Sequence, residues 1–175
     1  LRARILGREV ALRLAAPGRH MAMDAVAALL GAAALDVPPI AAAEALARFV
    51  PMAGRGARRT VVVPGGTALL LDESYNASGA SVRAALAVLA LQPATRRIAV
   101  LGDMLELGEA GPAEHRGLAP AVVAGADLLF TCGPLMAGLH AAVPPSLRGA
   151  HAETSEELAP LVAAHGFRPG PVEYE

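Results

Sequence analysis

Five polar side chains follow a short apolar segment, residues 68–71, near the middle of the chain: Asp72, Glu73, Ser74, Tyr75 and Asn76. Two adjacent carboxylates cannot cradle a phosphate, because all of these groups are negatively charged. They can accept hydrogen bonds from ribose hydroxyls or from an ammonium group. The segment 72–76 is therefore a candidate binding site for a sugar hydroxyl or an amine.

The residues around this segment predict the start of an α/β unit. Residues 68–71 indicate a buried strand, and a helix is predicted after Gly79 because apolar residues recur on one face. These are Val82, Ala85, Leu86 and Leu89. In a strand–turn–helix unit, ligands bind at the carboxyl end of the strand.

Two more predicted strands end in polar or glycine-containing turns. Segment 98–101 leads into Gly102 and Asp103, and segment 127–130 leads into residues 131–133. Because parallel strands share one carboxyl edge, we expect the loops after Leu71 and Leu101 to lie side by side on one sheet and to form a binding site. Two alternatives stay open: Asp103 could cap the next turn, and Tyr75 could be an exposed aromatic residue.

Histidine and cysteine residues give weaker candidates. His115 is interpreted as packing on the turn at Met104 rather than as a catalyst. Cys132 has no histidine placed beside it by the sequence, so a nucleophilic role is not favoured. The spacing of the other histidines does not suggest a metal site, and none is predicted in this chain.

The amino-acid composition argues against several classes of function. All 15 basic residues are arginine, which excludes a phosphate-loop lysine or a Schiff-base lysine within the chain. The net charge of −1 argues against a general nucleic-acid binder. No apolar run reaches the roughly 18 residues of a membrane span. The single cysteine fits a reducing cytoplasm, so a cytoplasmic location is expected.

Residues 51–59 are rich in glycine and arginine and lack an apolar period, which predicts a linker. Its arginines, among them Arg55, have two open interpretations. They could form a solvated loop, or a guanidinium could stabilise a phosphoryl group, since the planar fork of arginine matches phosphate geometry.

Before the linker, the sequence predicts a strand over 10–14 and helices over 20–34 and 40–50. Leu30 and Val50 are expected to face inward. After the linker, a hairpin is predicted from Thr60 to Leu71. Strands and helices then alternate: helix 112–124 divided at Pro120, strand 127–130, a short helix to Ala142, strand 147–151 and a helix beginning near Thr154. This alternation predicts a mostly parallel, three-layer α/β sheet from about residue 60.

Four sequence elements resemble the Mur ligase family. Asp72-Glu-Ser-Tyr-Asn-Ala-Ser-Gly79 is similar to its Asp-Asp/Glu-Ser-Tyr-Asn-Ala-Asn-Pro segment, and Gly102-Asp-Met-Leu-Glu-Leu-Gly108 followed by His115 to its Gly-Asp-Met-x-Glu-Leu-Gly…His signature. Gly18-Arg-His20 and Gly54-Arg55 resemble a central-domain element and the linker arginine. The resemblance implies a Rossmann-like domain with helices on both faces (60–175), a linker (51–59) and a mainly helical remnant of a central ATPase domain (1–50).

As function, the resemblance implies part of an ATP-dependent ligase. ATP with Mg²⁺ would phosphorylate the carboxylate of UDP-N-acetylmuramoyl-tripeptide, and the amine of D-alanyl-D-alanine would attack the acyl phosphate. The product is a peptidoglycan precursor, which connects the reaction to cell-wall biogenesis, cell shape and cell division. The phosphate loop, the magnesium ligands and the N-terminal and central domains would lie outside this chain, which alone is expected to be inactive and to bind no cofactor tightly.

The resemblance also implies residue roles. Arg55 would approach the γ-phosphate, Glu73 with Asp72 would bind the ribose, and His20 and Asp24 would lie near adenine. The remaining candidates would line the cleft for the dipeptide: Ser74, Tyr75, Asn76 and Asp103.

Departures from the family pattern lead to two further expectations. Ser78-Gly79 replaces Asn-Pro, which predicts a looser helix start. After Gly170 the family continues with a strand ending in Lys-Gly-Ser, so the last strand is expected to be truncated here. Alternative functions are a non-catalytic, truncated Mur-like binding module or a related Mur or folylpolyglutamate ligase domain. A dinucleotide-binding domain is disfavoured because no Gly-x-Gly-x-x-Gly follows a strand.

Overall fold

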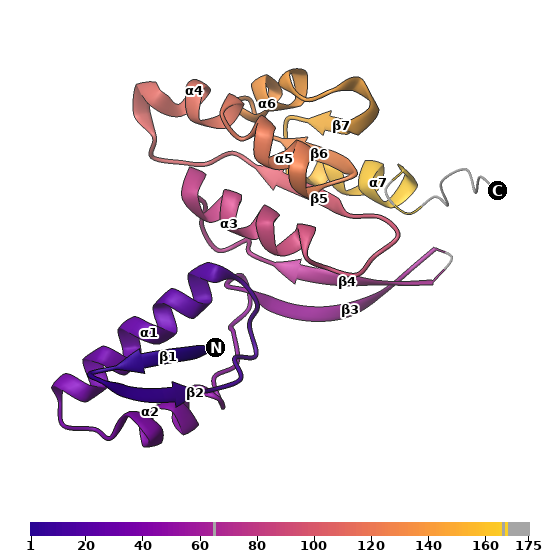
Figure 1. The fold of residues 1–175 in the computed structure, drawn as a ribbon. Coiled ribbons are helices and arrows are strands. Elements are labelled where there is room, and N and C mark those ends of the chain that lie inside the picture. The colour runs from indigo at the N-terminus through magenta and orange to yellow at the C-terminus, as the bar shows by residue number, and fades with distance from the viewer. Residues whose placement is uncertain (65, 166, 168–175) are drawn as a thin grey trace.

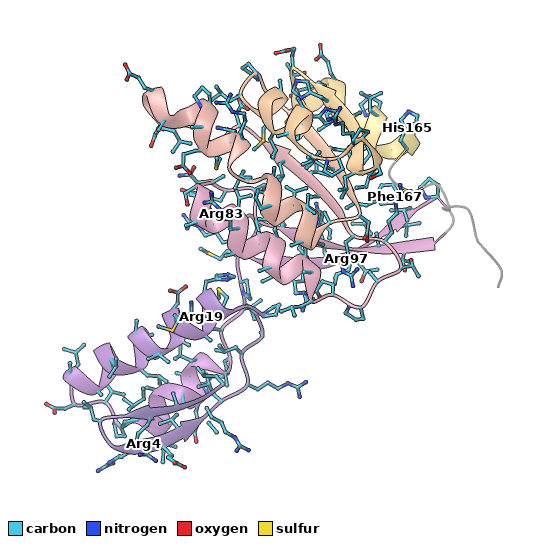
Figure 2. The ribbon with its side chains drawn as sticks, turned by 45° about the horizontal axis from the view of Figure 1, so that its top comes forward. Arg4, Arg19, Arg83, Arg97, His165 and Phe167 are labelled. Atoms are coloured by element: carbon cyan, nitrogen blue, oxygen red, sulfur yellow. The ribbon has the colours of Figure 1, made fainter. Side chains whose placement is uncertain are left out.

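The computed structural model describes residues 1–64, 66–165 and 167, which form an N-terminal and a C-terminal part joined by the segment after residue 46 (Figure 1). Arg4 lies in the N-terminal part, whereas Arg83 and Arg97 lie in the C-terminal part (Figure 2). None of the described helices combines the length and the apolar character that crossing a membrane requires.

The N-terminal part is a two-stranded hairpin packed on two helices. Strands β1 (Arg2–Ile5) and β2 (Arg8–Ala11) pair antiparallel around Leu6 and Gly7, which both have positive φ. Helices α1 (Arg19–Ala34) and α2 (Pro39–Leu46) cover the hairpin. The core contains five buried residues: Ile5, Val10, Leu29, Ala42 and Ala43.

Several expectations for this part need correction. The part contains more helix than strand, as predicted, but β1 was not predicted and the second strand ends at Ala11 rather than at residue 14. Leu30 is exposed, because the buried face of α1 runs through Ala25 and Leu29. Val50 is 74% exposed, because α2 ends at Leu46 and residue 50 follows it in irregular chain.

A long hairpin begins the C-terminal part. Strands β3 (Ala57–Val63) and β4 (Gly66–Asp72) pair antiparallel, with Ala57 opposite Asp72. The predicted hairpin is confirmed, although β3 starts three residues earlier than expected. β4 is not a buried strand, since Leu69 and Leu70 are exposed.

The predicted three-layer α/β arrangement is confirmed around a parallel sheet. Its strands are β5 (Ile98–Gly102), β6 (Leu128–Cys132) and β7 (Arg148–Ala152), in the order β5-β6-β7. Alternate residues of β6 face opposite sides. Leu129 joins a core formed with α3 (Gly79–Ala90), α5 (Ala119–Gly125) and α6 (Met136–Ala142). Leu128 and Phe130 pack with α7 (Ser155–His165) on the other face.

The shorter elements agree with the predicted helix break at Pro120 and the predicted helix start near Thr154. Helix α4 (Gly111–Arg116) is separated from α5, whose first turn contains Pro120. Two 3₁₀ turns occur at Gly108–Ala110 and Pro145–Leu147. At the start of α7 the backbone N–H of Glu157 donates to Thr154 Oγ1 at 3.3 Å, as the predicted cap requires.

The expectation of one sheet from residue 60 onward is wrong for the described residues. Their strands form three sheets, and β4 pairs with β3 but not with β5. A cavity of about 590 Å³ lies between β4 and β5. This separation explains why Val100 of β5 is 52% exposed although its segment is continuously apolar. The predicted truncation of the last strand concerns residues 168–175, which lie outside the described part of the chain.

Candidate functional site

The loop after β4 is shaped by its own polar side chains. Asp72 Oδ1 accepts the hydroxyl of Ser74 at 2.6 Å and the backbone N–H of Ser74 at 3.2 Å. Asn76 Oδ1 accepts the N–H of Ala77 at 2.8 Å. The bond from the Ser74 N–H to Asp72 is typical of an Asx turn, which provides a partner for a backbone donor where the strand ends.

The helix start after the loop is firmly capped, which corrects the expectation of a loose start. Ser78 is the N-cap of α3, and its Oγ accepts the N–H of Ser81 at 3.2 Å. The Ser81 hydroxyl in turn accepts the N–H of Ser78 at 2.9 Å. This reciprocal pair is a capping box with serine in place of the usual glutamate or glutamine.

A cavity of about 320 Å³ lies where the two parts of the chain meet. It is lined mainly by four groups of residues: α1 and the segment before it, the linker, the loop after β4, and two residues of α3 (Gly79–Ala90). Among the predicted site residues it brings together His20, Asp24, Arg55, Glu73, Tyr75 and Asn76. Its volume is at the lower end of the range for small-molecule sites.

Arg55 is held at this cavity by an aromatic contact. Its guanidinium carbon lies 3.9 Å from the centre of the Tyr75 ring, a cation–π arrangement. Tyr75 is 67% exposed, so one face of its ring carries Arg55 while most of the side chain stays in solvent. The other two linker arginines lie in β3, where Arg58 donates to Gln92 Oε1.

Of the two neighbouring acids, Asp72 and Glu73, only Glu73 lines the smaller cavity. Partial burial raises the pKa of the Glu73 carboxyl, and nearby Asp72 adds to the effect while His20 opposes it. Its side chain is exposed and only partly desolvated, so the carboxylate can accept hydroxyl donors from a ligand.

The carboxylate of Asp72 is already engaged by the protein. Besides Ser74 it accepts the backbone N–H of Gly54 at 3.0 Å. These hydrogen bonds, the Ser74 hydroxyl first, hold the pKa of Asp72 below its usual value. Asp72 and Ser74 line the larger cavity between β4 and β5 rather than the smaller one.

Asp103 combines a structural role with a place at the larger cavity. Its carboxylate accepts the N–H groups of Leu135 at 3.2 Å and Met136 at 2.8 Å, and so caps the start of α6. It also lines the cavity that contains the polar loop 72–76. The two loops thus border one cavity, although they do not end strands of one sheet.

His115 packs on the turn after β5, as predicted. Its Nε2 accepts the N–H of Met104 at 2.9 Å, and its Nδ1–H donates to the carbonyl of Gly111 at 2.6 Å. The side chain is fully buried and lies 3.9 Å from Asp103. His115 therefore fixes the loop that carries Asp103.

Within residues 1–64, 66–165 and 167, no three side chains of histidine, cysteine, aspartate or glutamate lie together as metal ligands. His140 and His151 lie close, with ring centres 5.8 Å apart, but as a pair between α6 and β7.

Sequence reasoning missed the backbone that surrounds Arg55. Gly54 and Gly56 both have positive φ, 75° and 89°, a conformation that favours glycine. A Cβ on Gly54 would lie 3.0 Å from the Tyr75 backbone nitrogen. The glycines on both sides of Arg55 were the sequence signal that could have predicted this backbone conformation. Phe49 and Val88, which line the smaller cavity, had no distinguishing pattern.

Together these features define an α/β domain of Rossmann-like architecture with a ligand cavity at its junction with a second part. Residues 57–170 match the family described as Mur ligase, glutamate ligase domain. The chain therefore belongs to the Mur ligase family.

Curated relatives carry one name, UDP-N-acetylmuramoyl-tripeptide–D-alanyl-D-alanine ligase. The protein from Escherichia coli K12 is 36% identical over 118 residues, covering 67% of this chain and 25% of the relative. The protein from Synechocystis is 49% identical over 63 residues, covering 35% of this chain and 14% of the relative. The chain thus spans a quarter or less of the length of these relatives.

Solved structures support the same family. A crystal structure of MurF from Acinetobacter baumannii matches 88% of this chain and 33% of its own, with a TM-score of 0.75 and 27% identity. MurF from Thermotoga maritima in complex with ADP matches 93% of this chain and 36% of its own, with a TM-score of 0.76. At 20% identity the latter shows the fold alone.

Proposed function

We propose that this chain is part of an ATP-dependent ligase that adds D-alanyl-D-alanine to UDP-N-acetylmuramoyl-tripeptide, through an acyl phosphate, in peptidoglycan precursor synthesis. The observation that carries the proposal is one cavity that Arg55 and Glu73 both line, at the junction of the two parts. A guanidinium and a carboxylate are the groups that the phosphate and ribose ends of a nucleotide need.

The smaller cavity is assigned to the nucleotide. Glu73 would accept hydrogen bonds from the ribose hydroxyls, and Arg55 would stabilise charge on the transferred phosphoryl group. His20 and Asp24, on α1, line the same cavity and would lie towards adenine. Magnesium would neutralise the phosphates when bound, with ligands in a central domain outside this chain.

The larger cavity is assigned to the incoming dipeptide. Its polar lining includes Ser74, Tyr75, Asn76 and Asp103, while the strands contribute apolar surface. Tyr75 and Asn76 line both cavities, so the amine of the dipeptide would approach the phosphorylated carboxylate across this loop. Exclusion of water there would protect the acyl phosphate from hydrolysis.

The division of the chain into two domains and a linker is part of the same proposal. Residues 1–50 would be the end of a central ATP-binding domain, 51–59 the linker and 60–175 the C-terminal domain. The apolar cluster of the N-terminal part is separate from the two clusters of the C-terminal part, which supports this division. A cytoplasmic location is proposed because ATP and a single unpaired cysteine both fit a reducing compartment. The names of the curated relatives favour the ligase over a non-catalytic module.

The test is an Arg55→Ala variant of the full-length ligase. Loss of a preorganised charge at the phosphoryl group should lower kcat by about 10²–10³-fold. The measurement is phosphate release coupled to addition of D-alanyl-D-alanine. Arg59→Ala is the matched control, because Arg59 is an exposed arginine of β3 that does not line the smaller cavity. Equal kcat values for Arg55→Ala and Arg59→Ala would remove Arg55 from the mechanism.

A further inference from the structure

We propose that Asp72 is a positioning residue that fastens the linker to the end of β4 and so holds Arg55 at the nucleotide cavity. This inference rests on the proposed ligase function for the role of Arg55. It assigns to Asp72 a task different from ribose binding, although Glu73 next to it keeps that role.

Three hydrogen bonds join the linker to residues 72–75. The Gly54 N–H donates to Asp72 Oδ2 at 3.0 Å, and the Gly56 N–H donates to the Asp72 carbonyl at 2.9 Å. The Tyr75 N–H donates to the Gly54 carbonyl at 3.1 Å. Arg55 lies between the two glycines, so its backbone is fixed on both sides.

The side chain of Arg55 is fixed by the same segment. Its guanidinium carbon stacks 3.9 Å from the Tyr75 ring centre, and the Tyr75 backbone nitrogen is one of the three donors. The close approach needs glycine at 54, where a Cβ would lie 3.0 Å from the Tyr75 Cβ. The Asp72 carboxylate therefore holds the backbone next to Arg55, and the bond from Tyr75 to Gly54 keeps the ring beside the Arg55 guanidinium.

The two carboxylates at 72 and 73 divide their roles by environment. Asp72 accepts three donors from Gly54 and Ser74, which occupy three of the roughly four acceptor positions of a carboxylate. The same donors favour the charged form and hold the pKa of Asp72 low. Glu73 lines both cavities, and among the described residues its carboxylate has no such set of donors, so it is the acid that can accept hydrogen bonds from ribose hydroxyls.

The first experiment uses NMR on the 175-residue chain with Asp72→Ala, Asp72→Asn and Glu73→Gln. Stacking on Tyr75 shifts the Arg55 Hδ and Hε resonances upfield, and the Gly54 and Gly56 amides should exchange slowly with solvent. Asp72→Ala should abolish the Arg55 shift and Gly54 protection. Asp72→Asn, which keeps one acceptor oxygen, should retain part of both. Glu73→Gln should keep both, because it removes the same charge without touching the linker.

The second experiment measures kinetics of the full-length ligase. Misplacement of Arg55 should lower kcat by about 10–10²-fold in Asp72→Ala, with partial recovery in Asp72→Asn and an ATP KM within about twofold of wild type. A ribose ligand would instead raise the ATP KM. That result, or an Asp72→Ala chain with an unchanged Arg55 shift, would overturn the proposal.

The two experiments separate this inference from the function on which it rests. Absence of ligation by the wild-type full-length protein would refute the proposed function, yet the NMR comparison would still decide whether Asp72 fastens the linker. An unchanged NMR signature beside normal wild-type ligation would refute only the role of Asp72.

Discussion

The neighbouring acids Asp72 and Glu73 have pKa values shifted in opposite directions. Hydrogen bonds from Ser74 and Gly54 lower the pKa of Asp72, whereas partial burial raises the pKa of Glu73. Charged Asp72 therefore stabilises the fold, with a contribution that is lost as pH falls through its lowered pKa. Charged Glu73 opposes folding, because the native state binds its proton more tightly than the unfolded chain does.

Glu73→Gln should slightly stabilise the free chain at pH 7. Removing a carboxylate that is partly desolvated relieves an unfavourable charge, so the melting temperature should rise. The difference from wild type should shrink as pH falls through the raised pKa of Glu73 towards its ordinary value of 4.5, because the wild-type carboxyl is then protonated too. Thermal melts between pH 4 and 8 measure this, beside Glu44→Gln on the exposed surface of α2 as control. A lower melting temperature at pH 7 for Glu73→Gln would contradict the expectation.

Among the elements, helix α3 carries the site because its start is capped by side chains of the same loop. The Ser78–Ser81 capping box satisfies two backbone donors at its first turn. Gly79 fits closely there, since a Cβ would lie 2.8 Å from both Arg83 and Glu114. The loop 72–76 thus enters a helix with a defined direction, which keeps Tyr75 and Asn76 at the cavities.

Ser78→Ala should lower the free energy of unfolding by about 1 kcal/mol, because the Ser81 N–H loses its acceptor at the helix start. Urea denaturation followed by circular dichroism measures the loss. Ser78→Asn is the matched comparison, since asparagine also caps helices and should restore most of the stability. Equal midpoints for the alanine and asparagine variants would show that capping does not stabilise α3.

Across the whole molecule, the two parts meet where Gly18 approaches α3. Gly18 has a φ of 118°, and a Cβ there would lie 2.8 Å from Val88 Cγ2 and 2.7 Å from His20 Cε1. Both neighbours line the smaller cavity. The backbone at residue 18 therefore sets how closely α1 approaches the C-terminal part, and with it the shape of the proposed nucleotide site.

Gly18→Ala should destabilise the chain by about 1–3 kcal/mol, because the new methyl group clashes and the backbone is strained. Amide exchange should rise around residues 12–20 as this contact loosens. Gly31→Ala is the matched control in the last turn of α1, where a Cβ meets nothing within 4 Å. It should stabilise by up to about 1 kcal/mol, since alanine favours helix over glycine. If both variants gained stability, the contact between Gly18 and Val88 would be unimportant.

The sequence alone determined the order and type of most elements of the C-terminal part. Alternation of apolar strands with amphipathic helices is a local pattern, and it predicted β5, β6, β7, α3 and α7 close to their observed bounds. The same locality explains the site loop, since residues 72–76 lie next to one another in the chain. The resemblance to Mur ligases added the expected roles of Arg55 and Glu73, which remain proposals.

Only the tertiary structure decided which neighbours these elements have. Whether an apolar strand is buried depends on what packs beside it, and β4 and β5 flank a cavity rather than pairing with each other. Contacts across the chain likewise set the environments of Asp72 and Glu73, because the Gly54 N–H reaches Asp72 from 18 residues away. Local patterns cannot carry such information, since hydrogen bonding and desolvation depend on groups brought together by folding.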